Sequence, residues 1–242
     1  MNTTVLKLGY RSGLVAFIAT MAFFIAQLLQ LAGTLTYPMD EILIYGFSLC
    51  ITIPFLLEFL ALYYATPAEK KIWSHAALLF STIYVVFVTA NYVVQLATVI
   101  PATLRDEAAE IKILVQTPHS LFWNFDAIGY IFMGLAALVA IPVFKNKGIQ
   151  KWVKYIFIAH ALTTPLIAWV YFYPEFSEDL LLIGLPWGIT APAAMLILAL
   201  WFRKEISDRS NFPDKKTKTA NQSAYLSSSL PSQAMDKQET LL

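Results

Sequence analysis

Charged residues are scarce in this chain. They make up 14% of its 242 residues, whereas about 25% is usual in a soluble domain. Hydrophobic residues reach 58%, whereas about 45–50% is usual. This balance excludes an ordinary water-soluble domain, because too few polar side chains remain to cover its surface.

The chain also has few cysteines, few histidines and little net charge, and each of these limits the class of protein that it can be. Cys50 is the single cysteine, so no disulfide can form within the chain, and the redox compartment stays open. The three histidines lie far apart in the sequence, so the sequence predicts no metal site and identifies no cofactor. The formal net charge is +1, so no strongly basic surface indicates a nucleic-acid partner.

Sequence motifs that carry chemistry are missing as well. The chain contains no G-x-x-x-x-G-K-[ST], G-x-S-x-G, H-E-x-x-H or G-x-G-x-x-G. No lysine lies deep in an apolar run, which excludes a retinal-type Schiff base. The sequence therefore leaves enzyme activity open and favours a protein that is not an enzyme.

Long apolar runs are what the chain has instead. A run of about 20 residues is long enough to cross ~30 Å of hydrocarbon. Six such runs occur, at roughly 13–35, 43–65, 73–100, 121–144, 152–173 and 180–202. They predict an all-α membrane protein, in which residues 1–202 form a bundle of six transmembrane helices. Its first partner is the lipid bilayer, in a plasma membrane or a bacterial inner membrane.

The distribution of lysine and arginine predicts the orientation, because cytoplasmic segments carry an excess of both residues. If the N-terminus lies inside, all 17 of these residues except Arg105 and Lys112 fall on the inner side. Both termini are therefore predicted to be cytoplasmic. Residues 203–242 become abruptly polar, and we expect them to form a disordered cytoplasmic tail.

The segment between the third and fourth runs has a helical pattern of its own. Thr103 and Asp106 have the spacing of a capping box at the start of a helix. The apolar residues that follow recur at helical spacing: Leu104, Ala108, Ile111 and Val115. The pattern predicts a short interfacial helix on the outer membrane surface. A plain connection is the alternative.

Asp126 lies within the fourth apolar run. A charged residue at the centre of a membrane helix costs about 2.5–3.5 kcal/mol and usually faces the interior of a bundle. One helical face of this run carries His119, Trp123, Asp126 and Tyr130, and the third run has a matching stripe of Tyr84, Asn91, Gln95 and Thr98. We expect the two faces to meet and to form an outward-opening pocket that binds a ligand. Alternatively, Asp126 only locks the two helices together.

Glu58 and His160 form a second polar layer, nearer the inner side. Each lies about two turns from the inner end of its run, so the two are at similar depth. Such a pair could relay protons, since each side chain influences the protonation of the other. A static ion pair, or no contact between them, remains open.

The beginning of the sixth run contains Pro186, Gly188 and Pro192, which predict a kink or a short unwound stretch. Together with the two polar layers, this break favours a protein that binds or transports a small molecule or an ion around Asp126. A homodimer is a further expectation, because six spans are few for a transporter. The alternatives are a membrane-embedded enzyme acting on a lipid or quinone-like substrate, and a scaffold or sensor without catalysis.

Overall fold

The computed structural model describes residues 2–211, and every regular element in this range is a helix. Six helical segments are long and apolar enough to cross a membrane, which confirms the six predicted runs. They are Thr3–Leu31, Met39–Ala65, Ala68–Thr103, Leu121–Val143, Gly148–Phe172 and Asp179–Ser210.

Several of these segments consist of more than one helical element. The first two are the single helices α1 (Thr3–Leu31) and α2 (Met39–Ala65). The third contains the 3₁₀ turn η1 (Ala68–Lys70), α3 (Lys71–Val94), the π-helical turn η2 (Gln95–Val99) and α4 (Ile100–Thr103). The remaining elements are α5 (Leu121–Ala140), the 3₁₀ turn η4 (Ile141–Val143), α6 (Gly148–Phe172), α7 (Glu178–Ile183) and α8 (Leu185–Asn211).

Helix α1 begins well before the apolar run that predicted it. Asn2 caps it, since its Oδ1 accepts a hydrogen bond from the backbone N–H of Thr4 at 2.9 Å. The helix then passes through Lys7 and Arg11, which a count of apolar residues leaves outside the span. Helix α1 therefore begins about ten residues before the apolar run that was predicted to cross the membrane.

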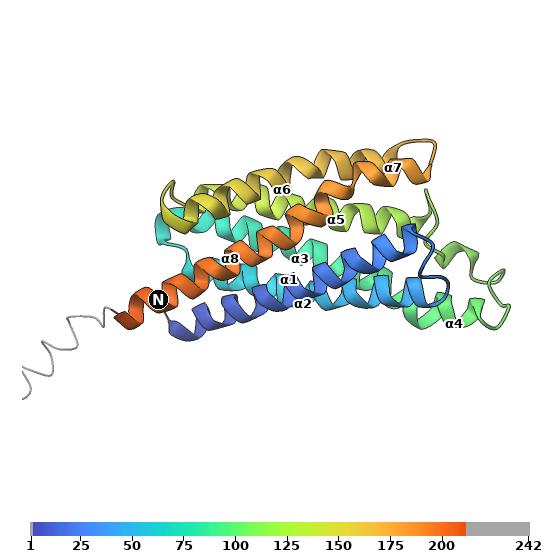
Figure 1. Cartoon of the computed structure of the whole chain (residues 1–242), viewed down its shortest axis with the longest axis horizontal. Helices are drawn as coiled ribbons and strands as arrows, with labels where there is room; N and C mark the ends of the chain where they lie inside the picture. Colours follow the sequence, from blue (N-terminus) through green and yellow to red (C-terminus); the bar gives the residue numbers. More distant parts are fainter. Residues whose placement is uncertain (1, 212–242) are drawn as a thin grey trace, which may run out of the picture. The chain divides into compact units, whose positions relative to one another are not determined.

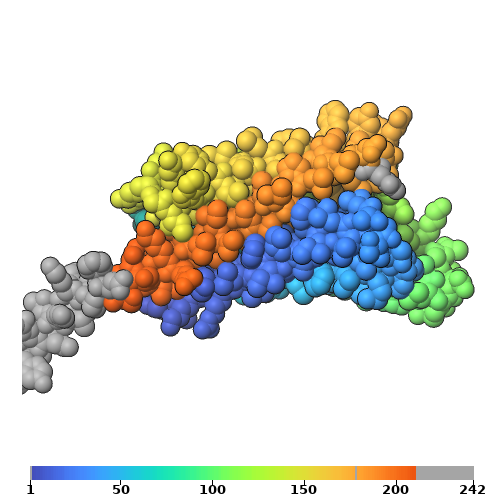
Figure 2. All heavy atoms as spheres, viewed as in Figure 1, coloured from blue at the N-terminus to red at the C-terminus, as the bar shows by residue number. Residues whose placement is uncertain are grey.

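Contacts between neighbouring helices arrange them in a ring, and Figure 1 shows this ring from the side, with the helices running lengthwise. Helix α1 contacts α2, α2 contacts α3, α3 contacts α5, and α5 contacts α6. Helix α8 closes the ring, because Thr190 contacts His160 of α6 and Met195 contacts Thr20 of α1. Figure 2 shows α1 and α8 side by side on one face. Side chains that point into this ring form the core.

The sixth segment is broken near its start, but at Gly184 and not at the Pro186–Pro192 cluster, which was predicted to be the break and is helical throughout. Helix α7 ends at Ile183, and α8 begins at Leu185 after the turn at Gly184. Pro186 lies in the first turn of α8, where a missing backbone N–H costs least. Pro192 lies inside α8, which continues past it.

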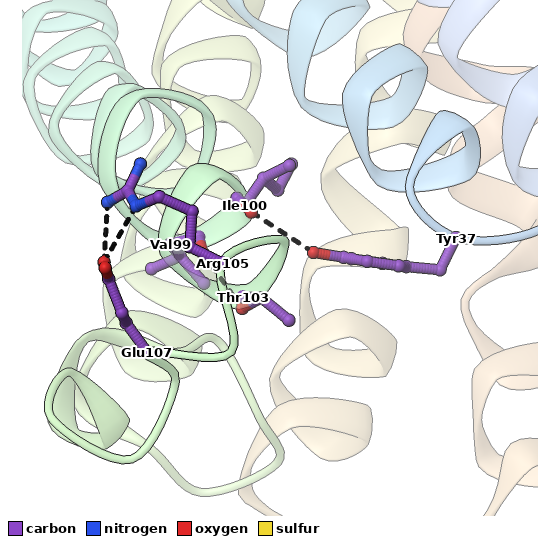
Figure 3. Close-up of polar contacts among 6 residues, drawn as sticks. All are labelled: Tyr37, Val99, Ile100, Thr103, Arg105 and Glu107. Atoms are coloured by element: carbon purple, nitrogen blue, oxygen red, sulfur yellow. Dashed lines mark hydrogen bonds and ion pairs between the residues drawn. The ribbon is translucent and has the colours of Figure 1, made fainter.

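The connection between α4 and α5 differs from the sequence prediction. Helix α4 ends at Thr103, whose hydroxyl donates back to the carbonyl of Val99 at 2.9 Å (Figure 3). Asp106 adopts a left-handed backbone with φ 60°, and the N–H of Glu107 donates to the carbonyl of Ala102 at 2.9 Å. These are features of a helix C-terminus, so Thr103 and Asp106 terminate a helix and do not start one.

The predicted interfacial helix is therefore not formed. Turns and the 3₁₀ turn η3 (Lys112–Leu114) occupy the segment from Leu104 to Ser120. Arg105 and Glu107 form an exposed ion pair here, with Nη2 and Oε2 2.8 Å apart (Figure 3). The hydrogen bond from Arg105 holds the pKa of Glu107 below its ordinary value.

Among the described residues, 2–204 form one compact unit, and 205–211 belong to a second. Of the second unit, the structure describes residues 205–211, which are helical. Helix α8 thus continues beyond residue 202, where the tail was predicted to begin. The rest of the predicted tail, residues 212–242, lies outside the described residues.

Candidate functional site

Asp126 lies in the second turn of α5 and is 4% exposed. Ser120 caps this helix, because its hydroxyl oxygen accepts the backbone N–H of Trp123 at 3.2 Å. The start of α5 is thereby fixed, and its inward face carries Asp126 into the bundle. The carboxyl group faces protein groups, as the sequence analysis predicts.

Four side chains donate hydrogen bonds to this carboxyl group. The hydroxyl of Tyr92 donates to Oδ1 at 2.6 Å, and the amide of Asn91 donates to the same oxygen at 3.4 Å. The amide of Gln116 donates to Oδ2 at 3.3 Å, and the hydroxyl of Tyr171 also donates to Oδ2. A carboxylate only accepts, so it can take all four bonds. The donors come from α3, from the 104–120 segment and from α6.

A second set of contacts holds the 104–120 segment over Asp126. The side-chain amide of Gln95 donates to the carbonyl of Leu114 at 2.8 Å. The carbonyl oxygen of the same side chain accepts the backbone N–H of Gln116 at 3.1 Å. Gln95 therefore makes a two-point contact that positions Gln116 for its bond to Asp126.

A cavity of about 320 Å³ opens beside Asp126. Its lining includes Leu31 at the end of α1, Gln116 of the 104–120 segment and Leu181 of α7. Figure 1 shows the α1–α2 connection and α7 at one end of the ring. Aromatic side chains form much of its wall, including Phe23, Tyr45, Tyr92, Trp123, Tyr130 and Trp187. Asp126 and Glu41 supply two carboxyl groups, and no Lys, Arg or His of residues 2–211 lines the cavity. The site is thus concave, aromatic and acidic.

The structure places five of the seven predicted ligand-binding residues in the cavity wall or directly behind it. Trp123, Asp126 and Tyr130 line the cavity. Behind this wall lie Asn91, which bonds Asp126, and Gln95, which holds the loop.

Tyr84 and His119 differ from the other predicted residues. Tyr84 is fully buried, with its ring 6.3 Å from that of Tyr130, and it does not line the cavity. His119 is exposed, with φ 65°, and does not join the site. It precedes the first residue of α5, so the helical spacing that placed it beside Asp126 does not extend to it.

Sequence reasoning missed several residues of the site. Tyr171 lies in the last turn of α6, where an aromatic residue reads as part of the interfacial belt. Gln116 lies in a turn whose path no periodicity predicts. Tyr45 did carry a signal, because Glu41, Tyr45 and Ser48 share a helical face of α2. In the structure Tyr45 stacks on Tyr92, with ring centroids 5.1 Å apart.

The inner layer is also present, but its two members do not bond. Glu58 and His160 line one void of about 10 Å³, the space of about one water molecule. The Nδ1 atom of His160 pairs with the hydroxyl of Thr190 at 3.2 Å. Both carboxyl oxygens of the fully buried Glu58 lack a hydrogen-bond partner among residues 2–211. Both side chains therefore border one void, and no hydrogen bond joins them.

Together these features define a six-helix protein compatible with a multi-pass membrane protein, with a polar, aromatic chamber at one end. Within residues 2–211, no three His, Cys, Asp or Glu side chains cluster closely enough to hold a metal ion. No protein-family model, curated protein or solved structure matches the chain. The function must therefore be argued from the chamber itself.

Proposed function

We propose that this protein is a multi-pass membrane protein that binds a small molecule or ion in the chamber beside Asp126, from the outer side of the membrane. One observation carries the proposal. Asp126 is buried and held by four donors, yet it still lines a cavity of about 320 Å³. Small-molecule sites are concave, mostly apolar and furnished with a few fixed polar groups, and they occupy about 300–1,000 Å³.

A purely structural role for Asp126 explains less of this arrangement. A hydrogen bond between membrane helices is worth roughly 0.6–2 kcal/mol, and a single bond would lock two helices. Here donors converge from α3, α6 and the 104–120 segment. Tightly packed helices also leave few voids, whereas this cavity remains open beside the carboxyl group.

Access from outside follows from the charge distribution. The α2–α3 and α5–α6 connections lie at the opposite end of the ring from the α1–α2 connection (Figure 1). They carry Lys70 and Lys145, and Lys70 donates to the carbonyl of Pro142 at 2.6 Å. The rule that cytoplasmic segments are basic would place this end inside and the chamber outside. Both termini are then cytoplasmic.

Transport is the second candidate, and the inner layer favours it. Gly188 lines the chamber and Ala191 lines the void beside Glu58, and these two residues of α8 lie about 4.5 Å apart along the helix. About one helical turn thus separates an outer chamber from an inner acid–histidine pair. A path through the bundle would need side chains to move only in the helical turn between Gly188 and Ala191.

Cysteine accessibility tests the proposal. In a Cys50→Ala background, Gln27→Cys places a thiol on the chamber wall, and Leu198→Cys places one at the fully buried inner void. A membrane-impermeant maleimide added outside intact cells should label the first variant and leave the second unlabelled. A screen of chemically diverse small molecules should then find compounds that protect Gln27→Cys and raise the unfolding temperature of the wild-type protein.

Two results would contradict the proposal. The first is labelling of Gln27→Cys from the inner side alone, which would reverse the orientation. The second is a labelled chamber that no compound protects, with Asp126→Asn unchanged in every property except stability. Asp126 would then serve only to join helices.

A further inference from the structure

We propose that the ligand of the chamber is a small organic cation, an amine or a quaternary ammonium compound. This inference rests on the proposed function and names its ligand class. The observations behind it are the chamber's two carboxyl groups without basic partners, its aromatic wall and its size.

The charge of the chamber is unbalanced. Asp126 and Glu41 line it, and no Lys, Arg or His of the described residues 2–211 does. The ion pair Arg105–Glu107 is exposed and involves neither acid. Buried charges are otherwise paired. A ligand that carries a positive charge would supply the missing partner.

The four donors around Asp126 fit this reading. They come from neutral hydroxyl and amide groups, which orient the carboxyl group and leave its charge uncompensated. Asp40 differs from the two chamber acids, since its Oδ2 accepts the amide of Gln30 at 2.9 Å and it does not line the cavity. The acid next to it, Glu41, faces the chamber.

The aromatic wall favours an organic cation over a hydrated metal ion. Cations are attracted to the faces of Trp, Tyr and Phe, and aromatic cages are a common means of binding quaternary ammonium groups. Trp187 stands edge-on to Tyr130, with centroids 4.9 Å apart, and edge-on to Phe23 at 5.7 Å. Trp123 packs against Tyr171 at 4.6 Å. These rings line the same cavity as the two carboxyl groups.

The volume limits the ligand further. At about 320 Å³, the chamber is at the small end of the range of about 300–1,000 Å³ for ligand sites. It therefore suits an amine with one ring or a short alkyl chain. A lipid or a peptide would not fit.

Three compounds of one shape test the inference: 2-phenylethylamine, 2-phenylethanol and phenylacetate, which carry charges of about +1, 0 and −1 near neutral pH. Their affinity for the purified wild-type protein can be measured by titration calorimetry and by the fluorescence of Trp123 and Trp187, which line the chamber. We expect the amine to bind at least about tenfold more tightly than the alcohol and phenylacetate to bind least.

Matched variants identify the group responsible. Asp126→Asn removes one charge from the chamber, and Glu41→Gln removes the other. Glu110→Gln removes the same charge from the exposed 104–120 segment at the same end of the protein. The preference for amine over alcohol should fall by about tenfold in Asp126→Asn and should stay within about twofold in Glu110→Gln, because exposed charges are screened. If Asp126→Asn fails to fold, Glu41→Gln and the wild-type series still decide the question.

The outcomes separate the two proposals. Equal or tighter binding of the alcohol or of phenylacetate overturns the cation inference and leaves a ligand-binding chamber. Protection of Gln27→Cys by other compounds, with no effect of the amine, has the same meaning. If nothing protects this thiol, the chamber is not a ligand site and the proposed function fails as well.

Discussion

Gly13 of α1 packs directly against the carboxyl group of Glu58. A β-carbon at position 13 would overlap Oε1 of Glu58 and would lie 2.7 Å from its Cδ and 2.8 Å from Cβ of Ala199. Real β-carbons do not approach other heavy atoms this closely. Three helices therefore meet at this point around a buried acid, and the glycine is what permits their approach.

Gly13→Ala should destabilise the protein by about 1–3 kcal/mol, the usual cost of overpacking a close-packed core. Gly46→Ala is the matched control, because nothing lies within 4 Å of a β-carbon there and alanine suits a helix better. Thermal unfolding in detergent measures both effects. An unchanged midpoint for Gly13→Ala would show that Glu58 can move away at no cost.

Tyr171→Phe and Tyr92→Phe should each lower stability, because each removes a hydroxyl that donates to Asp126. A typical hydrogen bond contributes roughly 0.5–1.5 kcal/mol. Tyr92→Phe should cost more, since this hydroxyl also contacts that of Tyr130 at 3.0 Å. Tyr155→Phe is the control, because Tyr155 is 49% exposed.

Double variants test whether the two tyrosines stabilise the protein through their hydrogen bonds to Asp126. If they do, Asp126→Asn combined with Tyr171→Phe should destabilise less than the sum of the single changes. Strict additivity would mean that the tyrosine stabilises α6 by another route, and that the carboxyl group is not the centre of the network.

The six helices could be predicted because long apolar runs have few other solutions. The meeting of Asp126 with Asn91 could also be predicted, since both lie at similar depth on neighbouring spans. The 3.6-residue periodicity of an α-helix does not predict which residues are buried where the helix type changes. The π-helical turn Gln95–Val99 adds a residue to its turn, so Thr98 is exposed although 3.6-residue spacing groups it with Asn91.

The 104–120 segment over Asp126 could not be predicted from sequence patterns, for a different reason. Asp is favoured at the start of a helix and is also one of the few non-glycine residues that adopt the left-handed backbone found at a helix end. Its spacing from Thr103 alone therefore does not distinguish a start from an end. The structure resolves this through the left-handed backbone of Asp106. The position of Gln116 over the carboxyl group then depends on contacts with Gln95, which are remote in sequence.

Glu58→Gln should raise the unfolding temperature of the protein. Glu58 is fully buried, and its carboxyl oxygens have no partner among residues 2–211. An unpaired buried charge is costly, and the amide of glutamine carries no charge. Glu69→Gln, at an exposed position in η1, is the control and should change little. A lower midpoint for Glu58→Gln would indicate that the acid supports the fold through contacts that the amide cannot make.

Trp187 lies between the chamber and the inner layer, and its removal should connect them. The side chain is 6% exposed and is wedged against Phe23 and Tyr130. Just beyond it, Ala191 is 1% exposed and lines the void that also contains Glu58 and His160. Since Ala191 lies one helical turn after Trp187, we expect the indole to form the floor of the chamber.

In a Cys50→Ala background, Ala191→Cys should resist an impermeant maleimide when Trp187 is present and react when Trp187→Ala is added. Trp201→Ala is the matched control, because this tryptophan is equally buried, also lies on α8, and packs against Phe144 at the opposite end. Truncation of Trp187 should open a route from the outer side, whereas truncation of Trp201 should leave the thiol unlabelled from that side. Equal reactivity in both variants would mean that any large void loosens α8, and that the chamber has no defined floor at Trp187.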